Sequence, residues 1–185
     1  MTTRWRPGFD PNHLYFITTK AVHYKHLFRR DIVKRIVVDA LYIATVLSRA
    51  TVYAFVVMPN HIHALLQCQE DHRPGYWVRT MKTTSARLIV RQYEVEGNQE
   101  VLNWLADQVK NPKRQAHKVW EDNYLAKAVV SECFMLQKLT YIHENPVQPH
   151  WELVDSPAAY AWSSAAFYEG GASLIPVQSA LELLG

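Results

Sequence analysis

Two histidines, His61 and His63, are separated by one residue in a segment rich in strand-forming side chains. Alternate side chains of a strand point to the same face, so both imidazoles should project together while Ile62 points toward a core. Two imidazoles at this spacing can bind one divalent metal ion if a third ligand comes from elsewhere. A His-x-His pair by itself is more often a surface or packing feature, so a second signal is needed.

A second polar group occurs in the segment from Ser131 to Asn145, for which the sequence predicts a helix. Ser131 is a suitable N-cap, and Pro146 must stop the helix. Residues three or four positions apart share a helix face. The polar face consists of Gln137, Lys138, Tyr141, Glu144 and Asn145. The Tyr141 hydroxyl is therefore predicted to point away from the core, beside the side-chain amide of Asn145.

The two groups together favour chemistry on a phosphodiester. A metal held by two imidazoles and an amide oxygen can polarise a non-bridging phosphate oxygen. A tyrosine oxygen can then attack phosphorus and form a covalent phosphotyrosine. Because this intermediate keeps the energy of the broken bond, a free 3′-hydroxyl can later displace the tyrosine and rejoin DNA. A phenol is mostly protonated at neutral pH, so a nearby cation must assist its ionisation. Lys138 is a candidate for that role, or for binding a neighbouring phosphate.

The elements that must position these residues follow from hydrophobic spacing and turn signals. Strands are predicted over 13–22, 51–58, 61–68 and 120–130, and helices over 31–47, 75–93 and 131–145. Segment 51–58 is apolar on both faces, so it should lie inside the sheet. Segment 94–118 is polar and is predicted as a loop with a short helix around 101–109.

The element order β-α-β-β-α-β-α favours an α+β fold, a ferredoxin-like split βαβ antiparallel sheet with helices, plus an extra C-terminal helix that bears the tyrosine. We expect residues 1–150 to form a single catalytic domain and residues 151–185 to be a C-terminal extension packed on it. Many unrelated functions use this sheet, so the fold alone names none of them.

The bulk properties of the 185 residues permit a polyanionic partner, since the net charge is +3 and the pI about 8.8. No apolar run approaches the ~18 residues that span a membrane, and the first residues lack the apolar core of a signal peptide. We therefore expect a cytoplasmic protein without a membrane partner.

Basic side chains that could hold a nucleic-acid backbone occur in clusters. The predicted helix 75–93 carries Arg79, Lys82 and Arg87, and a second basic cluster ends at Lys118. With Lys138 these residues are the candidates for nucleic-acid binding. Any one of them is more readily explained as a solvated surface charge, so the prediction rests on the clusters.

Segment 57–66 (VMPNHIHALL), followed by segment 141–147 (YIHENPV), resembles the REP-associated tyrosine transposases, which belong to the single-tyrosine transposases with a His-hydrophobic-His motif. Segment 160–164 (YAWSS) and the stretch from Trp120 to Tyr124 are also similar to that family. The resemblance spans about residues 10–168, and its motifs are specific in combination because they occur in the expected order.

The resemblance implies that His61 and His63 bind the metal, that Asn145 is the third metal ligand and that Tyr141 is the nucleophile. It implies cleavage of single-stranded DNA next to hairpins through a 5′-phosphotyrosine, with Mg²⁺ or Mn²⁺ as cofactor. Relatives include monomers and dimers that exchange helices, so a homodimer stays open. The alternatives are a catalytically inactive nucleic-acid-binding protein on the same fold and a metal-dependent phosphodiesterase that acts on a small substrate.

Overall fold

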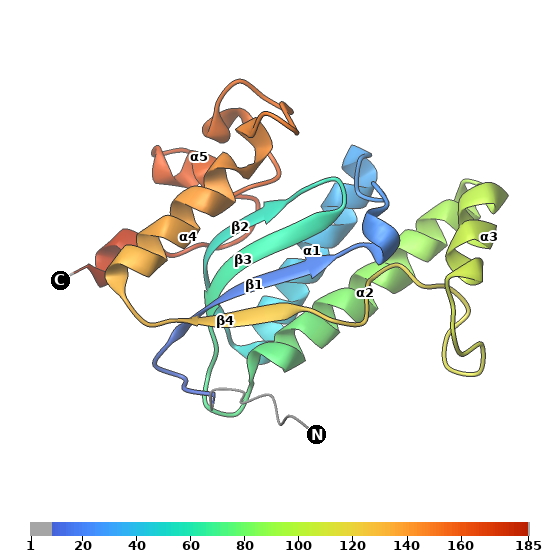
Figure 1. Ribbon diagram of the computed structural model, residues 1–185, viewed down its shortest axis with the longest axis horizontal. Coiled ribbons are helices and arrows are strands. Elements are labelled where there is room, and N and C mark those ends of the chain that lie inside the picture. The colour runs from blue at the N-terminus through green and yellow to red at the C-terminus, as the bar shows by residue number, and fades with distance from the viewer. Residues whose placement is uncertain (1–8, 185) are drawn as a thin grey trace.

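A computed structural model of the chain describes residues 9–184 and is built around a four-stranded antiparallel sheet with the order β2-β3-β1-β4 (Figure 1). The strands are β1 (Leu14–Lys20), β2 (Thr51–Val57), β3 (His61–Gln67) and β4 (Leu125–Val129). The α-helices are α1 (Asp31–Ser48), α2 (Pro74–Val95), α3 (Gln99–Asp107), α4 (Glu132–Glu144) and α5 (Ala165–Tyr168). The predicted ferredoxin-like α+β class is confirmed by this order and by the antiparallel pairing of all neighbouring strands.

The two faces of the sheet are covered by different helices. Helices α1 and α2 lie against one face, where Ile17 and Ile62 are fully buried (Figure 1). Helix α4 and the C-terminal segment cover the other face, which buries Phe16 and Leu65. Because side chains alternate along a strand, His63 is on the face of Leu65, the face that α4 covers.

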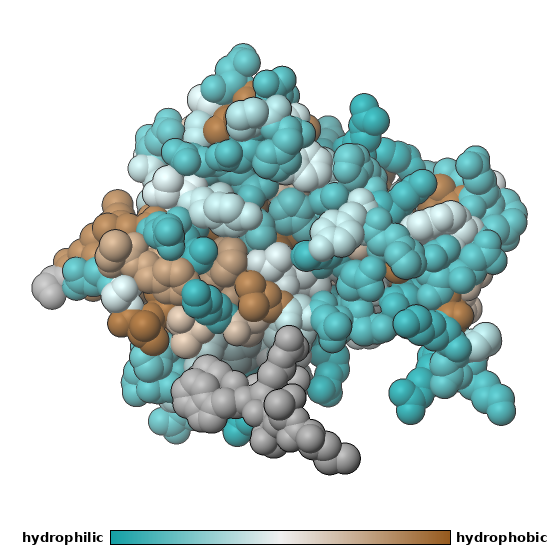
Figure 2. Space-filling model, viewed as in Figure 1, coloured by the Kyte–Doolittle hydropathy of each residue, from teal (hydrophilic) through white to brown (hydrophobic). Residues whose placement is uncertain are grey.

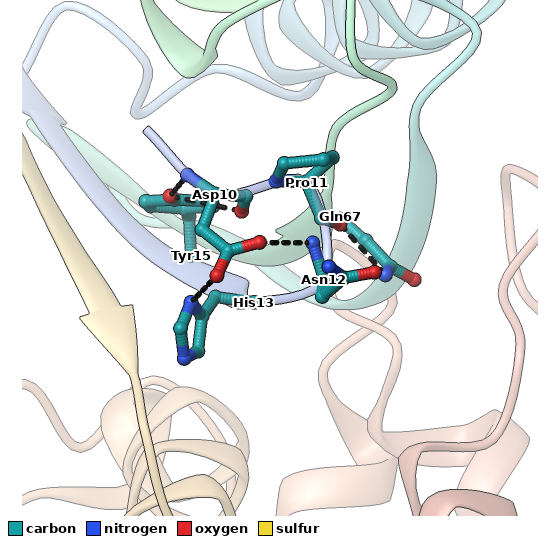
Figure 3. A network of polar contacts seen from close by, with 6 residues as sticks. All are labelled: Asp10, Pro11, Asn12, His13, Tyr15 and Gln67. Atoms are coloured by element: carbon teal, nitrogen blue, oxygen red, sulfur yellow. Dashed lines mark hydrogen bonds and ion pairs between the residues drawn. The ribbon is translucent and has the colours of Figure 1, made fainter. Parts of the chain in front are cut away.

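A polar network fixes the start of β1 against the end of β3 (Figure 3). The Tyr15 hydroxyl accepts a hydrogen bond from the Asp10 backbone N–H at 2.8 Å, and the Asp10 carboxylate accepts one from the Asn12 N–H at 2.9 Å. Gln67 at the end of β3 donates to the Pro11 carbonyl at 2.9 Å. These contacts stabilise the register in which Leu14 pairs with Gln67, at the far end of the two strands from the histidines.

Strand β2 lies at one edge of the sheet, although its apolar character predicted an interior position. The C-terminal segment accounts for the difference because it bonds to the outer edge of β2. The Val57 N–H donates to the Trp162 carbonyl at 2.9 Å, and the Ser164 N–H donates to the Phe55 carbonyl at 3.0 Å. The predicted division at residue 150 stays a prediction; Tyr160 belongs to the same hydrophobic cluster as residues of the sheet.

Segment 94–118 is more regular than predicted. The expected short helix is present as α3 and begins at Gln99, where the Asn98 side chain accepts a hydrogen bond from the Val101 N–H. Strand β4 is shorter than the predicted 120–130, because Trp120 makes only an isolated bridge to Ala21 and regular pairing begins at Leu125. Between Trp120 and Leu125, residues Glu121, Asn123 and Tyr124 line the cleft that is described below.

The surface has a hydrophobic end and a hydrophilic end (Figure 2). Hydrophobic residues gather around the start of α4 and the C-terminal end, where Val130, Leu136 and Leu183 are exposed, whereas the end that carries α3 is mostly hydrophilic. No helix within residues 9–184 is long and apolar enough to cross a membrane.

Helix α4 depends on its N-cap, since the Ser131 hydroxyl accepts a hydrogen bond from the Phe134 N–H at 3.2 Å. Replacing Ser131 with Ala should lower the free energy of unfolding by about 1 kcal/mol, as measured by urea denaturation. Ser156→Ala is the control, because Ser156 precedes a short 3-10 helix without making a side-chain cap bond. An equal loss in both variants would contradict the assigned role of Ser131.

Candidate active site

The two histidines lie on β3 opposite two polar residues of β1. In the antiparallel register, Thr18 pairs with His63 and Lys20 pairs with His61. Directly opposite residues share a face of the sheet, so all four side chains project to the side that α4 covers. The rings of His61 and His63 are 4.7 Å apart between centroids, which places both imidazoles at one location.

Each imidazole has one nitrogen engaged within the protein. His61 Nδ1 donates to the Asn60 side-chain oxygen at 2.6 Å, and His63 Nδ1 lies 2.8 Å from the Thr18 hydroxyl oxygen. When Nδ1 of a histidine carries the ring proton, its Nε2 keeps a lone pair for a metal ion. The second nitrogen of His63, Nε2, is buried and has no hydrogen-bond partner among the described residues. The arrangement therefore fixes both rings through Nδ1 and, in His63, leaves Nε2 without a partner among these residues.

Tyr141 of α4 lies next to this pair in the same chain. Its ring centroid is 5.0 Å from that of His63 and 6.0 Å from that of Phe16. The side chain is exposed, as the helix pattern predicted, while Met135, Leu139 and Ile142 on the opposite side of α4 are buried. Lys138 lies one turn earlier, with its ammonium 5.4 Å from the Tyr141 ring centroid. Helix α4 thus brings a phenol and an ammonium group to the His63 side of the paired imidazoles.

Asn145 follows the last residue of α4, and its side chain is buried beside His61. Its Oδ1 has no hydrogen-bond partner among the described residues, so it is a buried acceptor left open. Residues 9–184 contain no group of three His, Cys, Asp or Glu side chains that could hold a metal ion. An amide oxygen is a suitable further ligand for an ion at the two imidazoles, and Asn145 lies beside His61 where it would supply one.

The electrostatic environment keeps both imidazoles neutral. Burial lowers the pKa of His61 to about 4, the Lys20 charge lowers it too, and the neighbouring Asn145 amide raises it. Burial also holds the pKa of His63 well below its usual value, and the charges of His61, Lys138 and Lys20 act in the same direction. A neutral imidazole is the form that binds a metal, so protons do not compete for these nitrogens at neutral pH.

An open cleft of about 840 Å³ lies in front of these groups. Besides His61, His63, Lys138 and Tyr141, it is lined by residues that the sequence analysis did not name as site residues. These are Phe16, Thr18, Thr19, Lys20, Tyr24, Glu121, Asn123, Tyr124 and Leu125. The alternating pattern of β1 could have grouped Thr18 with Lys20, but only the register with β3 shows that they face the histidines.

The other candidate nucleic-acid residues lie in a second groove of about 630 Å³, between α2 and the segment that precedes β4, which shares Glu121 and Tyr124 with the cleft. Arg79 and Arg87 line this groove, and so do Lys82 and Lys118. The Lys82 ammonium donates to the backbone carbonyls of Glu121 and Asn123, and burial lowers its pKa to about 8. The two lysines are therefore engaged within the protein, Lys118 through a 2.9 Å contact with Asp122. Their role in nucleic-acid binding stays a prediction.

Comparisons with known proteins identify similar sequences and folds. Residues 13–145 match the model of a family described as "Transposase IS200 like". No curated protein matches the chain. The solved structure of a REP-associated tyrosine transposase bound to a REP hairpin is similar over 96% of this chain and 93% of that one, with 15% identity and a TM-score of 0.65.

A second solved structure, of a candidate transposase from Deinococcus radiodurans R1, covers 78% of this chain and 97% of its own, with 23% identity and a TM-score of 0.46. The identity of 15% to the hairpin-bound structure supports a shared fold and nothing finer.

The buried imidazoles predict how stability depends on pH. His143 is a third histidine with a lowered pKa, which burial brings to about 4. Its Nε2 lies 2.9 Å from the Ser164 hydroxyl oxygen. Below a pH of about 6.5 the unfolded chain binds protons that the folded chain does not. The metal-free protein should therefore lose stability as the pH falls from about 6.5 toward about 4.

Urea denaturation at several pH values in this range measures how steeply the free energy of unfolding changes with pH. Replacing His143 with Gln should reduce this slope by up to about 1.4 kcal/mol per pH unit, because one of the protons taken up on unfolding is removed. A variant that loses stability with pH as steeply as the unaltered protein would contradict this assignment.

Proposed function

The chain belongs to the IS200-like transposase family and is a transposase that acts through a tyrosine, and we propose that this tyrosine is Tyr141. The observation that carries the proposal is the 5.0 Å separation between the ring centroids of Tyr141 and His63 within one chain. Tyr141 is also the exposed tyrosine of a helix whose opposite side is buried, so its hydroxyl is accessible to a substrate.

The proposed reaction is attack of the Tyr141 oxygen on a phosphodiester of single-stranded DNA. A bond forms between that oxygen and phosphorus, and the bond from phosphorus to the 3′-oxygen breaks. The phenol loses its proton, and the departing 3′-oxygen gains one, which leaves a 5′-phosphotyrosine and a free 3′-hydroxyl. The Lys138 ammonium, 5.4 Å from the Tyr141 ring centroid, would bind an oxygen of a phosphate close to the attacked one. The reverse attack by another 3′-hydroxyl then joins two DNA strands.

The residues that would hold Mg²⁺ or Mn²⁺ are His61 and His63 through Nε2 and Asn145 through Oδ1. Support comes from His63 Nε2 and Asn145 Oδ1, which are buried and have no hydrogen-bond partner within residues 9–184, since such atoms are costly unless a ligand uses them. When bound, the ion would polarise a non-bridging oxygen of the phosphate and offset its negative charge. The Thr18 hydroxyl and the Asn60 amide orient the two rings for this task.

The proposed substrate is single-stranded DNA that carries hairpins, cleaved next to the hairpin. The similar REP-associated transposase is bound to a REP hairpin, which supports this class of DNA for the present chain. The cleft holds the Lys20 and Lys138 side chains near the proposed nucleophile, as a polyanionic strand requires. Because Tyr141 and both histidines converge in one chain, we further propose that each tyrosine serves its own site even in a homodimer.

The nucleophile assignment predicts a covalent adduct. Incubation of the protein with a hairpin-bearing single strand and Mn²⁺ should give a protein–DNA species on a denaturing gel, and Tyr141→Phe should abolish it. His63→Ala should also prevent the adduct, because it removes a metal ligand. An adduct that persists in Tyr141→Phe would rule out this nucleophile.

A mixture of the Tyr141→Phe and His63→Ala proteins tests whether the site is complete in one chain. We expect no adduct from the mixture, since neither chain contains both groups, and restored activity would show exchange between subunits. DNA binding without any adduct from the unaltered protein would instead favour the inactive nucleic-acid-binding alternative.

The contact between Thr18 and His63 predicts a role in metal affinity. Thr18→Val removes the hydroxyl that orients the ring, so the Mn²⁺ concentration for half-maximal adduct formation should rise by about 10- to 100-fold. Thr51→Val is the matched control, because Thr51 is also a strand threonine but pairs with Gln67 at the other end of β3 and does not line the cleft. Equal shifts in the two variants would contradict the orienting role of Thr18.

A further inference from the structure

The turn that follows β1 has an unusual backbone. His23 and Tyr24 both have positive φ angles, of 51° and 54°, and neither is glycine. Residues with side chains rarely adopt this left-handed conformation, and two in succession are rarer still. Such strain persists only where the surroundings fix it, and it is concentrated at ligand-binding and catalytic sites.

Two polar side chains hold the turn in place. The His23 N–H donates to the Glu121 carboxylate at 2.8 Å, from the segment that precedes β4. The Asn60 side chain donates to the Tyr24 carbonyl at 3.2 Å, and its oxygen accepts the 2.6 Å hydrogen bond from His61. The same amide therefore fixes the strained turn and the first of the paired histidines, so their relative position is set by one side chain.

The turn presents a cation and an aromatic ring to the cleft. The Lys20 ammonium hydrogen-bonds to the Tyr24 hydroxyl and lies 4.3 Å from the Tyr24 ring centroid. Tyr24 is 56% exposed, although it lines the cleft, so its ring is accessible. Within residues 9–184, no carboxylate forms an ion pair with Lys20. A lysine that has no paired carboxylate among the described residues is suited to bind an anion.

The positions of these groups along the cleft give their relation to the nucleophile. Tyr141 and Lys138 lie at the His63 end of the pair, where the Tyr141 ring contacts His63. Lys20 lies at the His61 end, because it pairs directly with His61 across the sheet. Lys20 and Tyr141 therefore lie toward opposite ends of the paired imidazoles, so a strand that runs along the pair from Tyr141 reaches Lys20.

We propose that Lys20 and Tyr24 form a second subsite for single-stranded DNA, in which Lys20 binds the phosphate next to the scissile one and Tyr24 stacks on the adjoining base. This subsite rests on the proposed function for its substrate class. Lysine and an exposed aromatic ring are the combination that holds a single strand without reading its sequence. Such a subsite accounts for the strained turn, because the turn places the Tyr24 ring in the cleft beside Lys20.

The test measures binding separately from cleavage. In the Tyr141→Phe background, a fluorescently labelled hairpin-bearing single strand is titrated at several salt concentrations. Lys20→Gln should lower the slope of log K against log salt by about 0.7 and weaken binding, because one phosphate contact is lost. Lys20→Arg should restore the slope. Lys25→Gln is the matched control, since Lys25 is exposed and its ammonium lies over the Trp104 ring at 5.2 Å, outside the cleft lining.

The Tyr24→Gly variant separates a binding role from a folding role. Glycine adopts a positive φ without strain, so the thermal midpoint should stay the same or rise. The affinity for the single strand should nevertheless fall by about tenfold, because the stacking ring is gone. A loss of affinity in a protein that is no less stable cannot result from unfolding.

The outcomes distinguish the two proposals. If the unaltered protein forms the adduct but binding depends on neither Lys20 nor Tyr24, the subsite is wrong and the proposed reaction stands. If the unaltered protein forms no adduct but binding loses its salt slope in Lys20→Gln and its affinity in Tyr24→Gly, the subsite stands and the reaction fails. An equal loss of slope in Lys25→Gln would show general charge attraction and would also overturn the subsite.

Discussion

The register between β1 and β3 is the constraint on which the site depends. It sets Thr18 opposite His63 and Lys20 opposite His61, and a shift by one residue would turn the β1 side chains to the other face. The same register buries Ile17 and Ile62 beneath α1 and α2, so hydrophobic burial on one face enforces polar pairing on the other. The network around Asp10 and Gln67 holds the far end of the two strands in this alignment.

Among the described residues, two of the buried polar atoms that lack a hydrogen-bond partner lie at the proposed metal site. His63 Nε2 and Asn145 Oδ1 are such atoms, and each costs about 1–3 kcal/mol if nothing binds it. Both lie where β3 meets α4, and the charges of Lys20 and Lys138 make protonation of the imidazoles still less favourable. These features impose a stability cost that a binding partner would offset, which is typical of functional sites rather than of cores.

Much of the architecture follows from local pattern. The alternation of His61 and His63 about Ile62 predicted a shared face, and the helical spacing of Tyr141 predicted an exposed ring opposite a buried side of α4. Strong periodicity makes such elements predictable, because each is determined by residues a few positions apart. Segment 94–118 lacks a long apolar repeat, so its pattern indicates α3 only in part, and the strand predicted over 120–130 begins only at Leu125.

The sequence by itself thus determined the element order, the faces of the individual strands and helices, and the residue types suited to phosphodiester chemistry. Only the tertiary structure decided which side chains meet: Thr18 with His63, Lys20 with Tyr24, and Lys118 with an acidic neighbour rather than with solvent. Strand register, the turn after β1 and the position of the segment before β4 depend on contacts between residues far apart in the chain. A local pattern cannot encode such contacts, because their free energy arises only when the separate elements pack together.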